Sequence, residues 1–381
     1  MKRFLSIFLL LFLLLSAFPV SADAAEFSGS LEAASAILIE PESGTVLYEK
    51  NADERRFPAS VTKVMTLLLV FEAIDSGRLS LDDNITVSPN AAGMGGSQVF
   101  LAPGEVMRAE DLLKSVIIAS ANDAAVALAE HLAGSEESFV ATMNRRAAEL
   151  GMTNTHFENA TGLDDTATDH KTSARDLAVA SRELILSHPK ILEYTGIWMD
   201  SIRDGAFTLT NTNRLIRFYN SATGLKTGST AKAGFCISAT AERNGTKLIA
   251  VIMGCSTRDR RNAEAKMLLD FGFANYEVFR SEGGSIEHIA ITGGVSSEFR
   301  AVYPGISILL EKGSAARVKR EISLSDSYAA PVETDGVIGM VTFTLDGKTI
   351  GESPIRSAEK VEKIGFAELF RRVAQKICAF S

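Results

Sequence analysis

The chain has 381 residues, of which 46% are hydrophobic and 23% charged, and its formal net charge is −8. This composition is ordinary for a soluble globular protein and excludes a disordered, collagen-like or coiled-coil chain, while the length predicts two or three domains. The acidic balance argues against nucleic acid as a general partner, and three cysteines do not make a disulfide scaffold.

The N-terminus has the pattern of a secretory signal. Lys2 and Arg3 precede an apolar run that ends near Ala17, and small residues follow it. This pattern predicts a signal peptide over residues 1–24, with cleavage after Ala22 or Ala24. The alternative, a transmembrane anchor, would need a run of about 20 apolar residues, and this run is shorter.

The next segments predict an α+β fold with an antiparallel sheet. Residues 33–50 read as a β-hairpin, and strands over 235–241 and 248–253 flank Asn244-Gly245, a strong hairpin signal. Helical patterns lie between and after these strands, at 60–76, 109–134, 136–150, 173–187 and 263–273. We expect one catalytic domain over residues 25–280, followed by a separate, small all-β domain over 282–358.

The C-terminal segment, residues 361–381, predicts an amphipathic helix. Its apolar stripe contains Phe366, Leu369, Phe370, Val373, Ile377 and Phe380, and its basic residues are Lys363, Arg371, Arg372 and Lys376. In an exported protein this pattern favours an anchor that lies in the plane of a membrane surface. The alternative is a helix that docks its apolar face on its own domain.

A first chemical motif is Ser60-Val61-Thr62-Lys63. A serine hydroxyl needs a base within hydrogen-bond reach to act as a nucleophile, and residues i and i+3 share one face of a helix. A lysine that is desolvated there can lose its proton near neutral pH. The same spacing recurs at Ser187, Ser229 and Ser357, but only Ser60 opens a long apolar helix.

Two further motifs are weaker when taken alone. Ser120-Ala121-Asn122 is expected in a loop entering a helix that starts near Asp123. It offers a hydroxyl that relays protons and an amide that holds a carbonyl, although Ser and Asn are also ordinary helix caps. Lys226-Thr227-Gly228 is expected on an edge strand, where its charge and hydroxyl suit a carboxylate and its glycine permits close backbone approach. A surface turn is the alternative for this motif.

The order of the three motifs is far more specific than each motif, and it is that of penicillin-binding proteins and serine β-lactamases. The flanking residues resemble the D-alanyl-D-alanine carboxypeptidases, the low-molecular-weight class of penicillin-binding protein, in serine peptidase family S11. The resemblance rests on 58–66, 128–130, 151–152 and 224–234. It spans residues 33–275 and extends to the small β-domain and the amphipathic tail.

The resemblance implies removal of the terminal D-alanine from peptidoglycan stem pentapeptides, without a cofactor, on the outer face of the cytoplasmic membrane. β-Lactam antibiotics are the implied covalent inhibitors. The implied roles are nucleophile for Ser60, base for Lys63, proton relay for Ser120, peptide orientation for Asn122, carboxylate binding for Lys226 and Thr227, close backbone approach at Gly228, and oxyanion-hole amides for Ser60 and Ser229. Ala121 departs from the family, in which glycine is commoner, but leaves both polar side chains in place.

The remaining candidates are expected to be structural. His156 and His170 are read as structural because serine and lysine already fill the catalytic roles. Cys236 should face Met253 across the hairpin, leaving Cys255 as a diagonal neighbour on the same face. Such neighbours are about 7–8 Å apart, so both thiols are expected to be free. No cluster has metal-ligand spacing.

Two other functions compete with the carboxypeptidase. A β-lactamase would need a glutamate that activates the deacylating water, and Glu158 lies at a comparable distance beyond Ser120 but lacks the expected surrounding motif. A catalytically silent wall-binding protein would not need all three motifs intact.

Overall fold

The computed structural model describes residues 26–378, which form two compact units divided between Tyr276 and Glu277. The expected signal peptide lies outside the described residues. The division falls a few residues before the expected boundary at 280–282, because β10 (Tyr276–Ser281) pairs with β13 (Ile306–Glu311) and so belongs largely to the second unit.

The first unit contains a five-stranded antiparallel sheet in the order β2-β1-β9-β8-β7. Its strands are β1 (Ser35–Glu40), β2 (Thr45–Lys50), β7 (Ala222–Thr230), β8 (Gly234–Arg243) and β9 (Thr246–Cys255). Both predicted hairpins are present. Asn244 and Gly245 have φ of 51° and 76°, the left-handed pair that a two-residue turn requires.

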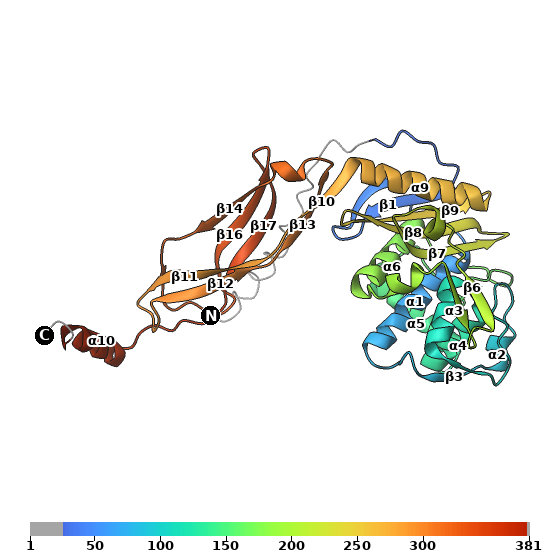
Figure 1. Cartoon of the computed structure of the whole chain (residues 1–381), viewed down its shortest axis with the longest axis horizontal. Coiled ribbons are helices and arrows are strands. Elements are labelled where there is room, and N and C mark those ends of the chain that lie inside the picture. Colours follow the sequence, from blue (N-terminus) through green and yellow to red (C-terminus); the bar gives the residue numbers. More distant parts are fainter. Residues whose placement is uncertain (1–25, 379–381) are drawn as a thin grey trace, which may run out of the picture. The chain divides into compact units, whose positions relative to one another are not determined.

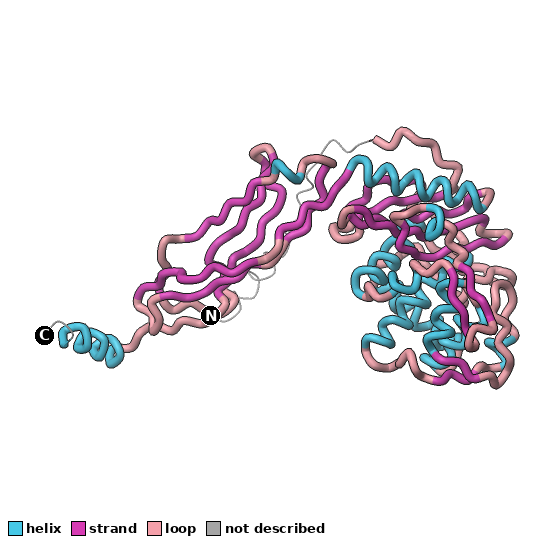
Figure 2. Tube along the Cα trace, in the orientation of Figure 1, coloured by secondary structure: helices cyan, strands magenta, loops and turns pink. Residues whose placement is uncertain are grey.

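Helices cover both faces of this sheet, which confirms the α+β expectation (Figures 1 and 2). On one face α6 (Ala174–Ser187) packs on β1 and β9, and α1 (Lys63–Asp75) packs on α6. On the other face α9 (Arg258–Asn275) packs on β8 and β9. Successive residues of β1 therefore point into different cores: Ile37 joins the core of the helical layer, and Leu38 joins the core under α9.

The helical layer confirms the predicted loop at Ser120. The helical pattern over 109–134 forms two helices, α3 (Ala109–Ile118) and α4 (Asn122–Ala133), and α4 begins next to Asp123, where the sequence predicts a helix start. Ser120 has φ of 62°, which no α-helix tolerates, and the backbone N–H of Asn122 is donated to Ser97 O at 2.7 Å. This break places Ser120 at a corner between two helices.

The other helices of the first unit mostly follow the sequence. α5 (Glu136–Glu149) and α6 lie where expected, while α9 begins five residues before the predicted 263 because the Thr257 side chain caps it by accepting from Arg260 N. The sequence analysis missed several short elements: α2 (Pro89–Ala92), α7 (Ile191–Thr195), α8 (Leu215–Phe218), and the ribbons β3 (Asn84–Thr86) with β4 (Val106–Arg108) and β5 (Met199–Ile202) with β6 (Phe207–Thr210).

The second unit is built on a six-stranded sheet in the order β14-β16-β17-β12-β11-β15. Its strands are β11 (Gly284–Thr292), β12 (Glu298–Tyr303), β14 (Lys319–Leu324), β15 (Tyr328–Ala329), β16 (Val337–Leu345) and β17 (Lys348–Ser357). Phe299, Val341, Phe343 and Ile355 belong to its core. This unit therefore has its own sheet and its own core.

The C-terminal helix α10 runs over Phe366–Cys378. The sequence pattern predicts a start at residue 361, and the observed start is five residues later. Val361 is buried in the second unit, where it exchanges two backbone hydrogen bonds with Val332, and that pairing excludes it from a helix. Phe366 and Phe370 are 84% and 68% exposed, so this apolar face is not docked on the β-unit. Within the described residues, no helix has both the length and the apolarity to span a membrane.

Cys236 and Cys255 are free thiols, as predicted, but they do not share a face of the sheet. Residue Phe235 pairs with Cys255 and Ile237 with Ile252, so β9 carries an extra residue at this point. Gly254, with φ of 74°, lies in the irregularity. As a result Cys236 joins the core of the helical layer and Cys255 joins the core under α9.

Candidate active site

Ser60 lies in a 3₁₀ turn, η1 (Ala59–Thr62), that leads directly into α1. One turn later Lys63 returns to the same face, and its Nζ lies 3.0 Å from Ser60 Oγ. Lys63 is completely buried, whereas Ser60 lines an open cavity. The serine hydroxyl is therefore reachable from solvent, and the amine beside it is not.

Buried polar groups hold the Lys63 amine in place. Its Nζ donates to Asn122 Oδ1 at 2.5 Å and to Thr161 O at 2.8 Å. Burial, reinforced by the nearby Lys226 ammonium, lowers the pKa of Lys63 well below its usual range, and Asp123 opposes this shift. A lysine in this state can accept the proton of Ser60 at neutral pH.

A loop over residues 157–172 packs directly beneath the nucleophile. Gly162, with φ of 87°, lies so close to η1 that a Cβ there would approach Ala59 O to 1.8 Å. The Asn159 side chain fixes the loop by accepting from Gly162 N at 2.7 Å. Only glycine permits this contact, which brings the carbonyl of Thr161 within reach of Lys63.

A second lysine–serine pair faces the first. Lys226 comes from the edge strand β7, and its Nζ donates to Ser120 Oγ at 2.8 Å and to Thr227 O at 3.0 Å. Burial, with a smaller effect of Arg261, lowers the pKa of Lys226 to about 7. The left-handed backbone of Ser120 between α3 and α4 aims its hydroxyl at this amine.

Asn122 connects the two halves of the site. Its Oδ1 accepts from Lys63, its Nδ2 donates to Gly95 O at 2.7 Å, and Asp123 next to it accepts from the backbone N–H groups of Val99 and Leu101. The N-terminus of α4 thereby fixes the loop around residues 95–101 beside the site. Because this loop includes Ser97, the connection also shapes the cavity wall.

The remaining predicted residues lie along β7. Thr227 Oγ1 donates to Thr212 Oγ1 at 2.8 Å, and Ser229 is exposed two residues later. A Cβ on Gly228 would lie 2.7 Å from Ser60 N, so the strand and the nucleophile turn touch at this glycine. The structure thus gathers all eight predicted site residues, which come from three distant parts of the sequence.

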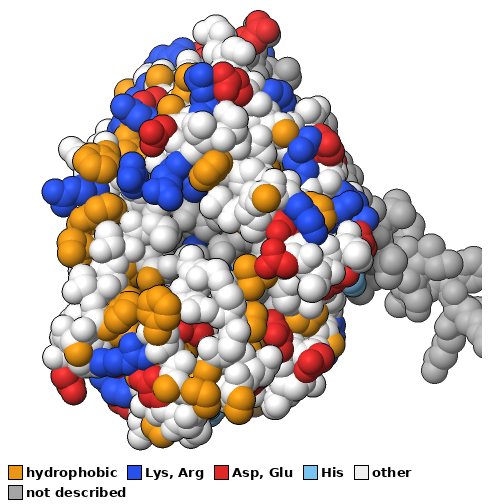
Figure 3. Space-filling view, turned by 90° about the vertical axis from the view of Figure 1, so that its right-hand side faces the viewer, with side chains coloured by type: hydrophobic (Ala, Val, Ile, Leu, Met, Phe, Trp, Pro, Cys, Tyr) orange, Lys and Arg blue, Asp and Glu red, His pale blue; other side chains and the backbone are white. Residues whose placement is uncertain are grey.

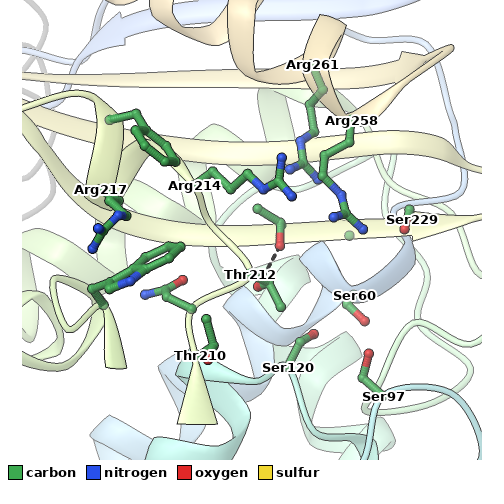
Figure 4. Close-up of a pocket in the computed structure, with 15 residues that line it drawn as sticks. Ser60, Ser97, Ser120, Thr210, Thr212, Arg214, Arg217, Ser229, Arg258 and Arg261 are labelled. Carbon is green, nitrogen blue, oxygen red and sulfur yellow. Dashed lines mark hydrogen bonds between the residues drawn. The ribbon is translucent and has the colours of Figure 1, made fainter. Parts of the chain in front are cut away.

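These residues surround a cavity of about 670 Å³ (Figure 4). Five predicted residues line it, namely Ser60, Ser120, Thr227, Gly228 and Ser229, whereas Lys63, Asn122 and Lys226 are buried behind its wall. Figure 3 shows the catalytic face hollowed near its centre. The volume is well above what a single alanine would fill and lies in the range of ordinary ligand pockets.

Sequence reasoning missed the arginines of this cavity. Arg214, Arg217, Arg258 and Arg261 line it, and no Asp or Glu is among the described lining residues. Arg261 is 3% exposed, and burial followed by the repulsion of neighbouring groups, Arg258 and Arg214 among them, lowers its pKa to about 10. The sequence holds these arginines as two local pairs, Arg214 with Arg217 and Arg258 with Arg261, a spacing that matches no functional motif.

Of the two weaker histidine candidates, His170 contacts the nucleophile turn and His156 does not. His170 Nδ1 accepts from Glu158 N at 3.0 Å, which leaves its Nε2 to donate to Thr62 Oγ1 at 2.8 Å. Burial lowers the pKa of His170 to about 4, so the ring is neutral. It packs the loop against η1 and does not line the cavity, as expected of a structural residue.

Glu158 does not take the position of a β-lactamase base. Its Oε2 accepts from Thr168 N at 3.0 Å, within its own loop, and it is absent from the cavity lining. No carboxylate of the loop over residues 157–172 is among the residues that line the cavity with Ser60.

Comparison with known proteins agrees with the family resemblance found in the sequence. Residues 20–257 match the family model of D-alanyl-D-alanine carboxypeptidase, and residues 281–363 match the C-terminal domain of penicillin-binding protein 5. The D-alanyl-D-alanine carboxypeptidase DacF of Bacillus subtilis is 42% identical over 384 residues, with 98% of each chain covered.

Solved structures agree with these matches. Penicillin binding protein 5 from Haemophilus influenzae has a TM-score of 0.75 and 31% identity, covering 89% of this chain and 100% of that chain. The ampicillin-bound penicillin-binding protein D2 from Listeria monocytogenes has a TM-score of 0.59 and 34% identity, covering 64% and 98%. The chain therefore belongs to the D-alanyl-D-alanine carboxypeptidases, the serine-type carboxypeptidases among the low-molecular-weight penicillin-binding proteins.

Proposed function

We propose that Ser60 is the nucleophile that removes the terminal D-alanine from a peptidoglycan stem pentapeptide. Its Oγ attacks the carbonyl carbon of the penultimate residue while Lys63 takes the hydroxyl proton. The observation that carries this proposal is the 3.0 Å contact between an accessible serine and a fully buried lysine of lowered pKa. The backbone amides of Ser60 and Ser229 are the proposed donors that stabilise the oxyanion.

The leaving D-alanine needs a proton on its nitrogen when the peptide bond breaks. Ser120, hydrogen-bonded to Lys226, is the proposed relay to that nitrogen, with the proton coming from the side of Ser60 and Lys63. The ester on Ser60 is then cleaved by water, which restores the hydroxyl and releases the shortened stem. A β-lactam would also form an ester on the Ser60 hydroxyl, and that ester would block the site.

The terminal carboxylate of the substrate would lie against Thr227 and Lys226. Arg261 is the further group that we propose for this carboxylate, because it is a buried cation in the cavity wall with no acidic partner among the described residues. Its other contacts, to Cys236 O and to Asn262 Oδ1, are with neutral acceptors.

The decisive experiment measures D-alanine release from a pentapeptide stem analogue and labelling by a fluorescent penicillin, in wild type and in Ser60→Ala. Release and labelling should both be lost in the variant. Persistent labelling of Ser60→Ala would overturn the assignment of the nucleophile. Rapid turnover of the penicillin by wild type would instead favour the β-lactamase alternative.

We also propose that the protein is exported and lies at the membrane surface through α10. The support for export is the signal pattern in residues 1–24, and the support for anchoring is the exposed apolar face of α10. Glu368 pairs with Arg371 and Arg372 at 2.7 and 2.9 Å, yet the helix still carries three basic residues against this one acid. The local positive charge suits an anionic membrane in spite of the acidic chain.

A further inference from the structure

The cavity holds more positive charge than the proposed reaction requires. D-Alanine as a terminal residue carries one carboxylate and a methyl side chain, and Thr227, Lys226 and Arg261 suffice for that carboxylate. Arg214 and Arg258 are exposed residues that line the same cavity, and neither has a role in binding it.

The guanidinium groups of these two arginines converge on that of Arg261. Figure 4 shows the three side chains entering from two directions, Arg214 from the segment before β7 and Arg258 and Arg261 from α9, with their guanidinium groups pointing toward one another. Both arginines contribute to lowering the pKa of Arg261, which agrees with this proximity. Like charges brought together in this way are stabilised when an anion lies among them.

Protein carboxylates do not supply that anion. Among the described residues Arg258 and Arg261 form no ion pair, and Arg214 has a single one, with Asp259 at 3.8 Å. Asp259 is 88% exposed and is not among the residues that line the cavity, so this ion pair is weak and leaves the positive charge facing the cavity uncompensated. The cavity is also larger than D-alanine requires.

We propose that Arg214 and Arg258 form a second anion subsite, which accepts a substrate whose terminal D-residue carries an acidic side chain. The inference rests on the proposed function and deepens it, because it extends the leaving-group side of the same site. The bond that is cleaved is unchanged: water again hydrolyses the ester on Ser60, and a dicarboxylic D-amino acid leaves in place of D-alanine. A guanidinium fork matches the geometry of a side-chain carboxylate and can bind it through two hydrogen bonds.

The test compares three stem analogues that differ only in the terminal residue: D-alanine, D-glutamate and its neutral isostere D-glutamine. For wild type, kcat/KM for the D-glutamate analogue should exceed that for the D-glutamine analogue by about tenfold at low ionic strength, and added salt should reduce this ratio. In the double variant Arg214→Gln/Arg258→Gln the ratio should fall to near one.

Arg260→Gln is the matched control. Arg260 is exposed on the same helix, pairs with Glu32 at 2.7 Å and does not line the cavity, so its substitution should leave the ratio as in wild type. Each ratio is measured on one protein preparation, so a smaller folded fraction in a variant cancels.

A wild-type ratio of one or less, or a ratio that persists in the double variant, would overturn the second subsite. Failure of the proposed function would look different, because wild type would then release no D-alanine from the D-alanine analogue.

Discussion

Charged side chains are usually exposed and large apolar side chains are usually buried, and two regions of this protein depart from that rule in opposite ways. The nucleophile region buries lysines, and α10 exposes phenylalanines. Lys63 and Lys226 are fully buried, whereas Phe366 and Phe370 lie exposed on a short helix. Each arrangement opposes the stability of the isolated protein. The two regions differ in what offsets this cost. Fixed hydrogen-bond acceptors inside the protein surround the lysines, whereas the phenylalanines need a membrane surface to cover them.

The first test of this comparison removes a buried amine. Lys63→Met should reduce the rate of acylation by penicillin about 10²- to 10⁴-fold, the usual contribution of a general base. It should also lower Tm, because Asn122 Oδ1 and Thr161 O lose their buried donor. Stopped-flow labelling and thermal denaturation measure the two effects. A variant that acylates at the wild-type rate would show that Lys63 is not the base.

The second test removes the exposed apolar face. Burying a phenylalanine side chain contributes about 1.5–3 kcal/mol, so Phe366→Ser/Phe370→Ser should weaken binding to anionic vesicles by roughly a hundredfold or more. Vesicle co-sedimentation measures this, with truncation after Gly365 as the reference, since a cut there keeps the Val361–Val332 pairing. Unchanged vesicle binding by both proteins would contradict the anchor.

The third test concerns a buried group that stays neutral. Because the pKa of His170 is lowered to about 4 in the folded chain, protonation favours the unfolded chain, in which an ordinary histidine has a pKa of about 6.5. Above pH 6.5 the protonation of His170 therefore does not change the free energy of unfolding. As the pH falls below 6.5, it lowers the free energy of unfolding progressively, by about 3 kcal/mol at pH 4.

Urea denaturation between pH 7 and pH 4 would reveal this loss as the difference between wild type and His170→Gln. The variant should be less stable at pH 7, because a hydrogen bond to Glu158 or Thr62 is lost, but its stability should fall less steeply toward acid. Parallel pH profiles for the two proteins would show that His170 does not titrate as described.

The smallest effect is expected at Lys226, whose pKa is lowered to about 7. Its ammonium is present below that pH and lost above it, so kcat/KM for an anionic substrate should fall about tenfold from pH 6 to pH 8 on this account. Lys226→Arg keeps the charge throughout this range and should remove that limb of the profile. A limb that persists in Lys226→Arg would assign the titration to another group.

The sequence by itself determined the elements that depend on neighbouring residues. The Asn244-Gly245 turn, the helix that starts at the Ser60 motif and the amphipathic pattern of the tail follow from local backbone preference and periodicity. The three motifs indicated the family from the sequence because their order is specific, even though each motif alone is weak evidence.

The tertiary structure alone decided what depends on distant contacts. The left-handed backbone of Ser120 lies beside the hydrogen bond from Asn122 N to Ser97 O, and an extra residue in β9 turns Cys255 to the face opposite Cys236. The arginines line the same cavity as Thr227 although they come from segments before and after β7, and Lys226 reaches Ser120 over 106 residues of sequence. Burial, which sets the pKa of both lysines, exists only once these segments pack together.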